Sequence, residues 1–447
     1  MGGRIIPGVQ VSVIKEALPR QLAPSGVLGL VGFTERQPSS GSERAGEWSR
    51  LVELFGEATA HSLPEARQAL ENGVSELVIV PLPENAGARA STSVPAREGD
   101  GKLRIEARSA GPWANGIKLR ILESSEPGRL EVVLEGQDAE LLERHRRLPK
   151  DDASALTHAL GRSRVVRIRS GEGLPPALGD YVLAEGEDAS ADEYREALGR
   201  LADESDVDMV LAAPQDVSPD HRLAIYSAVE AHCAAMSRDC KGRIGFGQIP
   251  PGGRPADHIT ALSGLQSERF VLVAPHGVVG AVAGMIGSLG YAQSPTFKPV
   301  AGVARRLSRL RLEEQRTLLR GNVVPVVNER GRGVLVLHGR TTDGDQINVR
   351  RIADRAVRTM KMIGDLFIGR MNNSDGREAL KQKLIEALTQ MEKDGALVPS
   401  TDGEDPAFKV EVHSSQADFA QGIVRVNMAV RPVRAIDFIY ATILVQA

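Results

Sequence analysis

Apolar and polar residues alternate along most of the chain in patterns that predict short strands and amphipathic helices. In the first part, residues 27–33 and 76–82 are predicted as strands. The helix expected between them begins at a capping box, Ser62 with Glu65, and ends near Asn72 and Gly73. From a second capping box at Ser190 onward, helices and strands alternate, with predicted strands at 207–212, 243–248 and 269–274 and predicted helices at 219–236 and 255–265. Such alternation is typical of βαβ units around a parallel or mixed sheet.

The pattern changes between these two parts. Residues 83–101 are rich in Gly, Ser, Pro and Ala and are predicted to be a linker. Beyond them the period is two, which predicts short strands, with one short helix at 153–160; the strands are expected at 103–107, 117–121, 130–134 and 165–169. We therefore expect an α/β (α+β) core built from residues 21–90 and 188–430, with a β-rich outer domain of residues 91–187 inserted into it.

Two long helices and two strands are predicted near the end of the core. The helices span residues 348–370 and 377–393, and the strands span 408–412 and 422–430. The first helix carries a series of basic residues: Arg350, Arg351, Arg355, Arg358 and Lys361.

Both ends of the chain, residues 1–20 and 431–447, are predicted to be extended arms. The first carries a half-buried strand pattern on Val9, Val11 and Val13, and no apolar run typical of a signal peptide precedes it, so synthesis in the cytosol is expected. The last segment is apolar on both faces: Ile436, Phe438, Tyr440 and Leu444 alternate with Ile439, Ile443 and Val445. Strands buried on both faces have this pattern, so either the chain's own sheet or that of a neighbouring copy must cover it.

Composition excludes several classes of protein. In 447 residues, 55 Lys and Arg balance 58 Asp and Glu, which argues against a surface built to bind nucleic acid. The two cysteines, Cys233 and Cys240, are too few for a disulfide scaffold and are spaced unlike a metal site; two buried thiols in a reducing compartment are expected. Residues 270–297 contain no Asp, Glu, Lys or Arg, yet Pro275 and Gly277 divide them into a strand and a helix, so no membrane insertion is expected. Gly280, Gly284 and Gly287 are expected to allow close backbone approach.

The sequence contains no recognisable set of catalytic residues. The chain has no phosphate-binding loop, no HExxH and no nucleophile elbow. The glycines of residues 26–32 fit a buried strand better than a dinucleotide loop, and Asp343 with Asp345 fits a turn and helix cap better than a cation site. His413 and Ser414 are expected in a solvated turn. We predict no catalytic residue, no metal and no cofactor; the alternative function is an α/β enzyme with a β-rich accessory domain.

Four segments of the sequence resemble the sheath proteins of contractile phage tails, tailocins and contractile injection systems. Residues 7–13 resemble their N-terminal start, with Gln10 in place of an aromatic residue, and residues 108–117 resemble the Gly-x-Trp-x-Asn-Gly turn of their inserted domain. Residues 273–284 are similar to the start of their glycine-rich helix, although residues 287–290 depart from the usual charged sequence. Residues 430–440 resemble their Arg-Pro ending.

The resemblance implies a structural subunit and no enzyme. Copies would polymerise as stacked, hexameric rings around an inner tube, joined by both arms through Val9, Val11, Val13, Ile436, Phe438, Ile439, Tyr440 and Ile443. The sheath would meet baseplate and sheath-terminating proteins, bind no nucleic acid, and contract to drive the tube through a target envelope. Assembly is expected in the bacterial cytoplasm, and the product is a phage tail or an injection particle, between which the sequence does not decide. Arg377, Lys381 and Lys383 are expected to face the tube, or else to form a solvated helix face.

Overall fold

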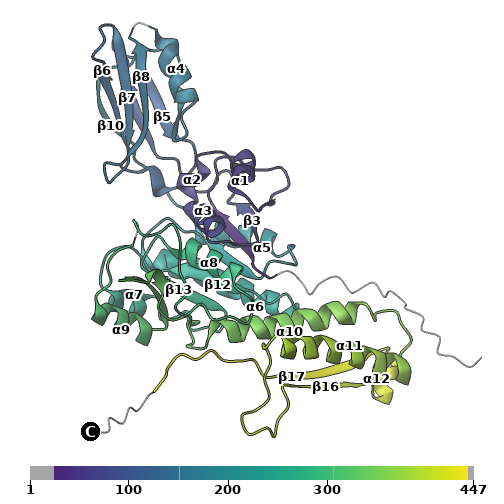
Figure 1. The fold of residues 1–447 in the computed structure, drawn as a ribbon. Coiled ribbons are helices and arrows are strands. Elements are labelled where there is room, and N and C mark those ends of the chain that lie inside the picture. The colour runs from purple at the N-terminus through teal and green to yellow at the C-terminus, as the bar shows by residue number, and fades with distance from the viewer. Residues whose placement is uncertain (1–24, 151, 306, 441–447) are drawn as a thin grey trace, which may run out of the picture.

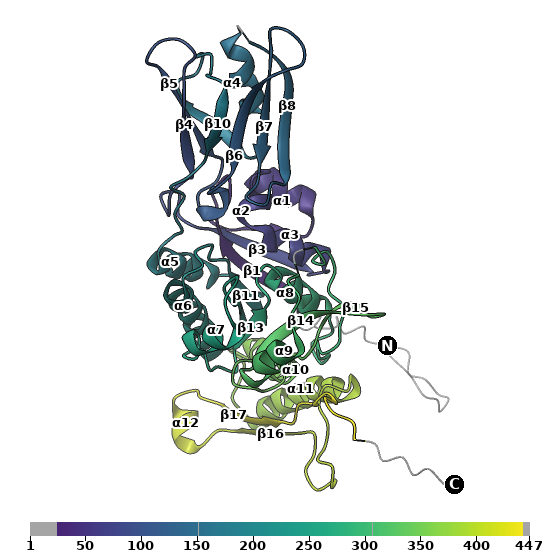
Figure 2. The same ribbon diagram turned by 90° about the vertical axis from the view of Figure 1, so that its left-hand side faces the viewer.

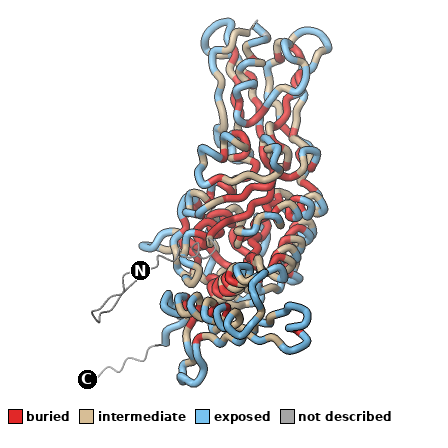
Figure 3. Tube along the Cα trace, turned by 90° about the vertical axis from the view of Figure 1, so that its right-hand side faces the viewer, coloured by how far each residue is buried: buried red, intermediate tan, exposed pale blue. Residues whose placement is uncertain are grey.

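The chain folds into an elongated molecule with three tiers (Figures 1 and 2). The structure is a computed structural model, and it describes residues 25–150, 152–305 and 307–440. A β-rich tier lies at one end, an α/β core lies in the middle, and a tier of two long helices with a β-hairpin lies at the other end (Figure 2). The buried residues concentrate in the middle tier, while the chain of the third tier is largely exposed or half-buried (Figure 3).

The core contains an eight-stranded sheet in the order β15-β14-β13-β12-β11-β1-β3-β2. Six strands run parallel, and β2 and β15 pair antiparallel at the two edges. The strands are β1 (Val27–Gly32), β2 (Glu43–Ala45), β3 (Glu76–Pro81), β11 (Met209–Ala212), β12 (Ile244–Gln248), β13 (Phe270–Ala274), β14 (Val323–Glu329) and β15 (Gly333–Val336). The alternation of strands and helices therefore predicted the mixed sheet correctly.

Helices cover both faces of this sheet, so its strands are apolar on both sides. In β1, Leu28 and Leu30 point to one helical layer, while Val27 and Val31 point to the other. The first layer contains α1 (Trp48–Phe55), α3 (Pro64–Glu71) and α8 (Val279–Ser288). The second contains α5 (Ala191–Leu201), α6 (Pro219–Arg238), α7 (Pro255–Ala261) and α9 (Leu312–Arg320).

Glycines of α8 allow it to lie directly against α3, as the sequence predicted. A Cβ atom at Gly284 would lie 2.4 Å from the carbonyl oxygen of Ala69, and one at Gly280 would lie 2.5 Å from the Cα of Glu65. A side chain at either position would therefore push the two helices apart. Within the described residues, no helix has both the length and the apolar character needed to cross a membrane.

The β-rich tier has its own sheets and its own apolar core. One sheet contains β4 (Ser91–Pro95), β5 (Lys102–Ala107) and β9 (Val166–Ser170), and the other contains β6 (Lys118–Glu123), β7 (Arg129–Glu135), β8 (Leu141–Pro149) and β10 (Gly179–Val182). Its short helix α4 spans Ala153–Gly161. The sequence prediction missed β4, β8 and β10, and its linker at 83–101 was wrong in part because β4 lies within it.

Two further local predictions were partly wrong. The hydroxyl of Ser62, the last residue of α2 (Thr59–Ser62), donates to the carbonyl oxygen of Phe33 at 2.8 Å, so it does not cap α3, whereas the capping box of Ser190 and Glu193 is present. Of the cysteines, only Cys233 is buried, and Cys240 is half-buried.

The third tier consists of α10 (Ile347–Asp365), α11 (Ser374–Lys393), β16 (Phe408–His413), α12 (Gln416–Ala420) and β17 (Arg425–Val430). The loop before α10 is a turn, as predicted, because Thr341 N donates to the carbonyl oxygen of Asp345 at 2.9 Å. The predicted helix cap was wrong: Gln346 occupies the cap position and makes no side-chain capping bond. Helix α10 lies between the core and α11 (Figures 1 and 2), and a buried ion pair of Arg269 with Asp354 at 3.0 Å joins it to the core.

Candidate assembly surface

The β16–β17 hairpin is a two-stranded sheet with one apolar face. Alternate residues, among them Val410, Val412 and Met428, pack toward the buried leucines of α11, while the residues between them face solvent. Within the described residues no third strand pairs with either outer edge. A two-stranded sheet is marginal by itself, and free edges are templates for strand addition. The described hairpin therefore leaves both edges open to strand addition.

The connection between the two strands is held by an ion pair. Arg425 contacts Asp418 at 2.8 Å, and together with the hydroxyl of Ser415 it holds the pKa of the Asp418 carboxyl well below its usual range. Ser415 also caps α12 by accepting from Asp418 N at 3.1 Å. These contacts fix the shape of the hairpin end. The predicted turn was wrong for His413, which ends β16 and pairs with Arg425, while Ser414 lies in the connection.

The segment after β17 is fixed along the domain as far as Asp437. Asn348 donates to the carbonyl oxygen of Val433 at 3.2 Å, and Gln346 donates to the carboxylate of Asp437 at 2.6 Å. The same carboxylate lies 3.1 Å from His338 Nε2. Sequence reasoning missed this attachment; its only signal was Asp437, the one acidic side chain among residues 431–447.

On both sides of Asp437, from Ile436 to Tyr440, the apolar side chains lie in solvent. The exposed fractions are 80% for Ile436, 66% for Phe438, 83% for Ile439 and 94% for Tyr440. Residues 431–440 contain no strand, so the first covering expected for them, this chain's own sheet, is not what the structure shows. The segment departs on the side away from α12 (Figures 1 and 2). Isolated exposed apolar residues are ordinary, but four within five positions mark an interaction segment.

The predicted tube-facing residues do not form one row on α11. Arg377 and Lys381 are one turn apart on the same face, whereas Lys383 lies on another side of the helix. Arg377 donates to the side-chain oxygen of Asn372 at 2.9 Å, and Lys383 pairs with Glu386 at 3.1 Å. The role of these three residues stays a prediction. Val9, Val11, Val13 and Ile443 lie outside the described residues.

Elsewhere in the described chain there is a groove beside the hairpin but no cluster of metal ligands. Among the described residues, no three His, Cys, Asp or Glu side chains gather as a metal site requires. A groove of about 400 Å³ lies beside the base of the hairpin, between residues of β16, β17 and the segment that follows, including Phe408, Val430 and Arg434. A groove along strand edges fits an extended peptide better than a small substrate.

We compared the sequence with models of known families and with curated proteins. Residues 340–446 match the family model for the phage tail sheath C-terminal domain. No curated protein sequence matches the chain.

Solved structures extend the likeness to the whole fold. A sheath tail protein of Listeria innocua is 16% identical, with a TM-score of 0.51 over 92% of this chain and 93% of that one. The helical sheath of the anti-feeding prophage in its contracted state is 16% identical, with a TM-score of 0.55 over 99% of both chains. The contracted sheath complex of the extracellular contractile injection system PVC is 12% identical, with a TM-score of 0.57 over 99% of this chain and 98% of that one. Residues 340–446 thus carry the C-terminal domain of phage tail sheath proteins, and the chain along its length has the fold of the solved sheath proteins.

Proposed function

We propose that this chain is the subunit of a contractile sheath, a helical cylinder around an inner tube. The observation that carries the proposal is the exposed apolar segment from Ile436 to Tyr440 on a domain whose hairpin has no strand paired to either edge among the described residues. Donor and acceptor are different surfaces of the same chain. Contacts between different surfaces build rings where the rotation between copies closes and open helical assemblies where it does not, so they suit a cylinder of stacked rings.

Strand addition is the mechanism by which the copies join. Residues 1–20 and 431–447 of one copy extend the β16–β17 sheet of its neighbours. A six-residue strand forms about five main-chain hydrogen bonds of about 1 kcal/mol net each, in addition to the burial of its Ile and Phe side chains. Such a connection between copies persists while the rest of the subunit moves as a rigid body, because the arm can bend while its strand stays paired.

Contraction then requires no nucleotide. Subunits that assemble in a stretched arrangement slide and rotate into better-packed interfaces, a bistable change that passes from ring to ring. We propose rings of six, an inner tube protein, baseplate contacts and a sheath-terminating protein as partners, and assembly in the bacterial cytoplasm. Arg377 and Lys381 on α11 are the proposed tube contacts, because both side chains remain partly accessible on one helical face.

Electron microscopy of the purified chain tests the proposal. Negative staining should show long hollow cylinders, alone or with the tube protein present. Deletion of residues 1–15 should leave a soluble, folded core that forms no cylinders. A chain that stays a monodisperse monomer even with its tube protein would overturn the sheath proposal, and unimpaired cylinders after the deletion would overturn the role of the N-terminal arm.

A further inference from the structure

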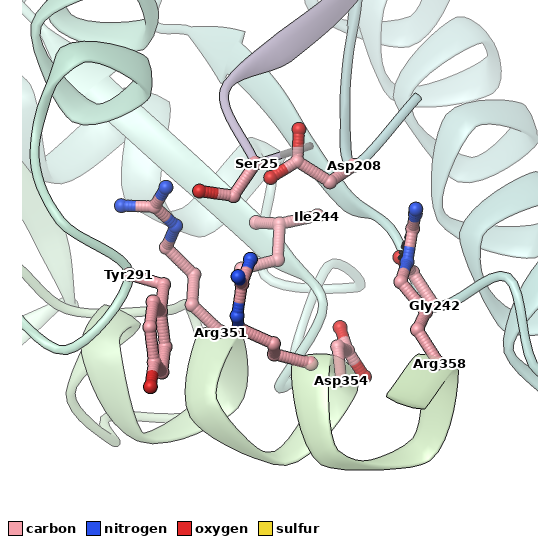
Figure 4. Close-up of a pocket in the computed structure, with 9 residues that line it drawn as sticks. Ser25, Asp208, Gly242, Ile244, Tyr291, Arg351, Asp354 and Arg358 are labelled. Atoms are coloured by element: carbon pink, nitrogen blue, oxygen red, sulfur yellow. Dashed lines mark hydrogen bonds between the residues drawn. The ribbon is translucent and has the colours of Figure 1, made fainter. Parts of the chain in front are cut away.

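Three arginines of α10 meet the core at the start of its strands. Arg351, Arg355 and Arg358 are spaced by four and three residues, which puts them on one face of the helix. Figure 4 shows arginine side chains rising from α10 toward Asp208, which directly precedes β11. These residues enclose a small cavity together with Ser25, Gly242, Ile244, Tyr291 and Asp354.

The carboxylates in the cavity wall are already engaged. Asp208 accepts hydrogen bonds from the main-chain nitrogens of Gly26 at 3.0 Å and Val27 at 2.8 Å. Asp354 accepts two hydrogen bonds from Arg269, each 3.0 Å, and Arg350 lies 3.0 Å from it on the side of its own helix. Among the described residues, the hydrogen bonds of Arg351 and Arg358 go to main-chain oxygens and not to either carboxylate.

Two of these arginines have partners of their own. The guanidinium of Arg355 lies 4.4 Å from the ring centroid of Tyr291. Arg358 donates to the main-chain oxygens of Gly242 at 2.7 Å and Val207 at 2.5 Å. Neutral carbonyls satisfy the donors of Arg358 without neutralising its charge.

Arg351 is the least satisfied of the three. Its side chain is 6% exposed, and its Nη1 donates to the carbonyl oxygens of Ile286 at 2.8 Å and Leu289 at 3.5 Å. Its Nε and Nη2 are buried and have no hydrogen-bond acceptor among the described residues. Burial lowers the pKa of Arg351, of Arg355 and of Arg358, because desolvation disfavours each charge. Buried donors without an acceptor are costly, so an acceptor on Nε and Nη2 of Arg351 would stabilise the wall.

We propose that this cavity binds an oxyanion, such as a phosphate or a carboxylate, on the Nε and Nη2 edge of Arg351. These two nitrogens form the side of the guanidinium that holds two oxygens of one anion in parallel hydrogen bonds. The cavity volume of about 20 Å³ accommodates one or two oxygen atoms, which suits the oxygens of a phosphate or carboxylate group and leaves no room inside for a larger ligand body. The proposal does not depend on sheath function. The bound anion links α10 to the strand ends, and so fastens the third tier to the core.

Calorimetric titration of the unassembled full chain with inorganic phosphate, at constant ionic strength set with chloride, tests the site. One saturable site is expected, and Arg351→Lys should weaken it at least about tenfold, because lysine keeps the charge and loses the paired donors. Arg370→Lys, which changes a residue stacked on Phe367 outside the cavity, should leave the affinity unchanged. Should Arg351→Lys fail to fold, Ser25→Asp supplies a competing carboxylate at the cavity wall and should abolish phosphate binding.

Two further measurements identify the source of the anion: competition by acetate in the unassembled chain, and phosphate binding by the assembled chain. Phosphate binding that persists in assembled chain identifies a free oxyanion as the ligand. Binding that acetate competes away in unassembled chain, and that disappears on assembly, identifies a carboxylate of a neighbouring copy. Absence of phosphate binding in the unassembled chain, or binding that Arg351→Lys and Ser25→Asp both leave unchanged, would overturn the proposal.

Discussion

The side-chain amide of Gln346 pairs with the main chain of Ala435 as a neighbouring strand would. Gln346 Oε1 accepts from Ala435 N at 2.8 Å, and Nε2 donates to the Ala435 carbonyl oxygen at 3.0 Å. The two residues are 89 positions apart in the chain. This pair sets the point at which the C-terminal segment leaves the domain, and it sets the direction in which the apolar residues beyond it are presented.

Replacing Gln346 with alanine should release that segment. The main-chain groups of Ala435 lose their partner, and each lost hydrogen bond to a partly buried group costs about 1–3 kcal/mol. Amide hydrogen exchange of residues 434–438 should become faster while exchange in the core sheet stays the same. Gln390→Ala, which removes an exposed hydrogen bond to Asp394 on α11, is the matched control. Unchanged exchange in Gln346→Ala would show that other contacts hold the segment.

The contact between α3 and α8 predicts opposite effects for two glycine-to-alanine changes. Gly284→Ala places a methyl group 2.4 Å from the Ala69 carbonyl oxygen, so it should lower the free energy of unfolding by about 1–3 kcal/mol through overpacking. Gly199→Ala, within α5, meets no atom within 4 Å and should raise the same quantity by about 0.5–1 kcal/mol, because alanine favours the helix. Urea denaturation of the two variants measures both. Equal effects of the two changes would contradict the close contact.

The buried imidazole of His232 predicts a pH dependence of stability. Burial, together with the nearby charge of Arg243, lowers the pKa of His232 to about 4 from its ordinary 6.5. Between pH 4 and pH 6.5 the imidazole of His232 is therefore protonated in the unfolded chain and neutral in the folded chain. Stability is complete above pH 6.5 and declines as the pH falls toward 4, by up to about 1.4 kcal/mol per pH unit from this group.

Comparison of variants isolates the contribution of His232 from that of other groups. His232→Gln keeps an acceptor for Arg243, which donates to the ring nitrogen at 2.7 Å, and it should lose less stability than the wild type between pH 7 and pH 5. His413→Gln, at an exposed position, should follow the wild type. Urea denaturation at the two pH values gives the difference. Parallel losses in all three proteins would rule out His232 as a source of acid sensitivity.

Much of the core was predictable because its strands and helices bury residues in regular patterns. Strands such as β1 and β13 are apolar on both faces, and that pattern survives in the sequence without knowledge of the partners. Strand β8 was missed because it pairs through its main chain at an exposed sheet edge, where charged side chains are tolerated. Ser62 has the residue type of a helix cap, but the fold uses its hydroxyl elsewhere.

The candidate surface was predictable only in its apolar part. The residue types of Ile436 and Ile439 alone predict that another surface covers them, since terminal segments are usually polar. The attachment of that segment was not predictable, because a polar side chain such as Gln346 has no periodic signal, and its partner lies 89 residues later. Contacts of this kind follow from the three-dimensional fold alone.

Charges placed on the exposed apolar segment should separate folding from assembly. Ile436 and Ile439 are 80% and 83% exposed, so Ile436→Asp combined with Ile439→Asp should change the free energy of unfolding by no more than about 0.5 kcal/mol per substitution. In a strand covered by a neighbouring copy, each aspartate would instead be a buried unpaired charge, so cylinders should be lost. Leu312→Asp, at a 60% exposed leucine at the start of α9, is the matched control and should assemble normally. Urea denaturation checks folding, and sedimentation velocity with negative-stain microscopy checks assembly. Normal cylinders from the double variant would mean that Ile436 and Ile439 stay in solvent in the assembled sheath and that copies join elsewhere.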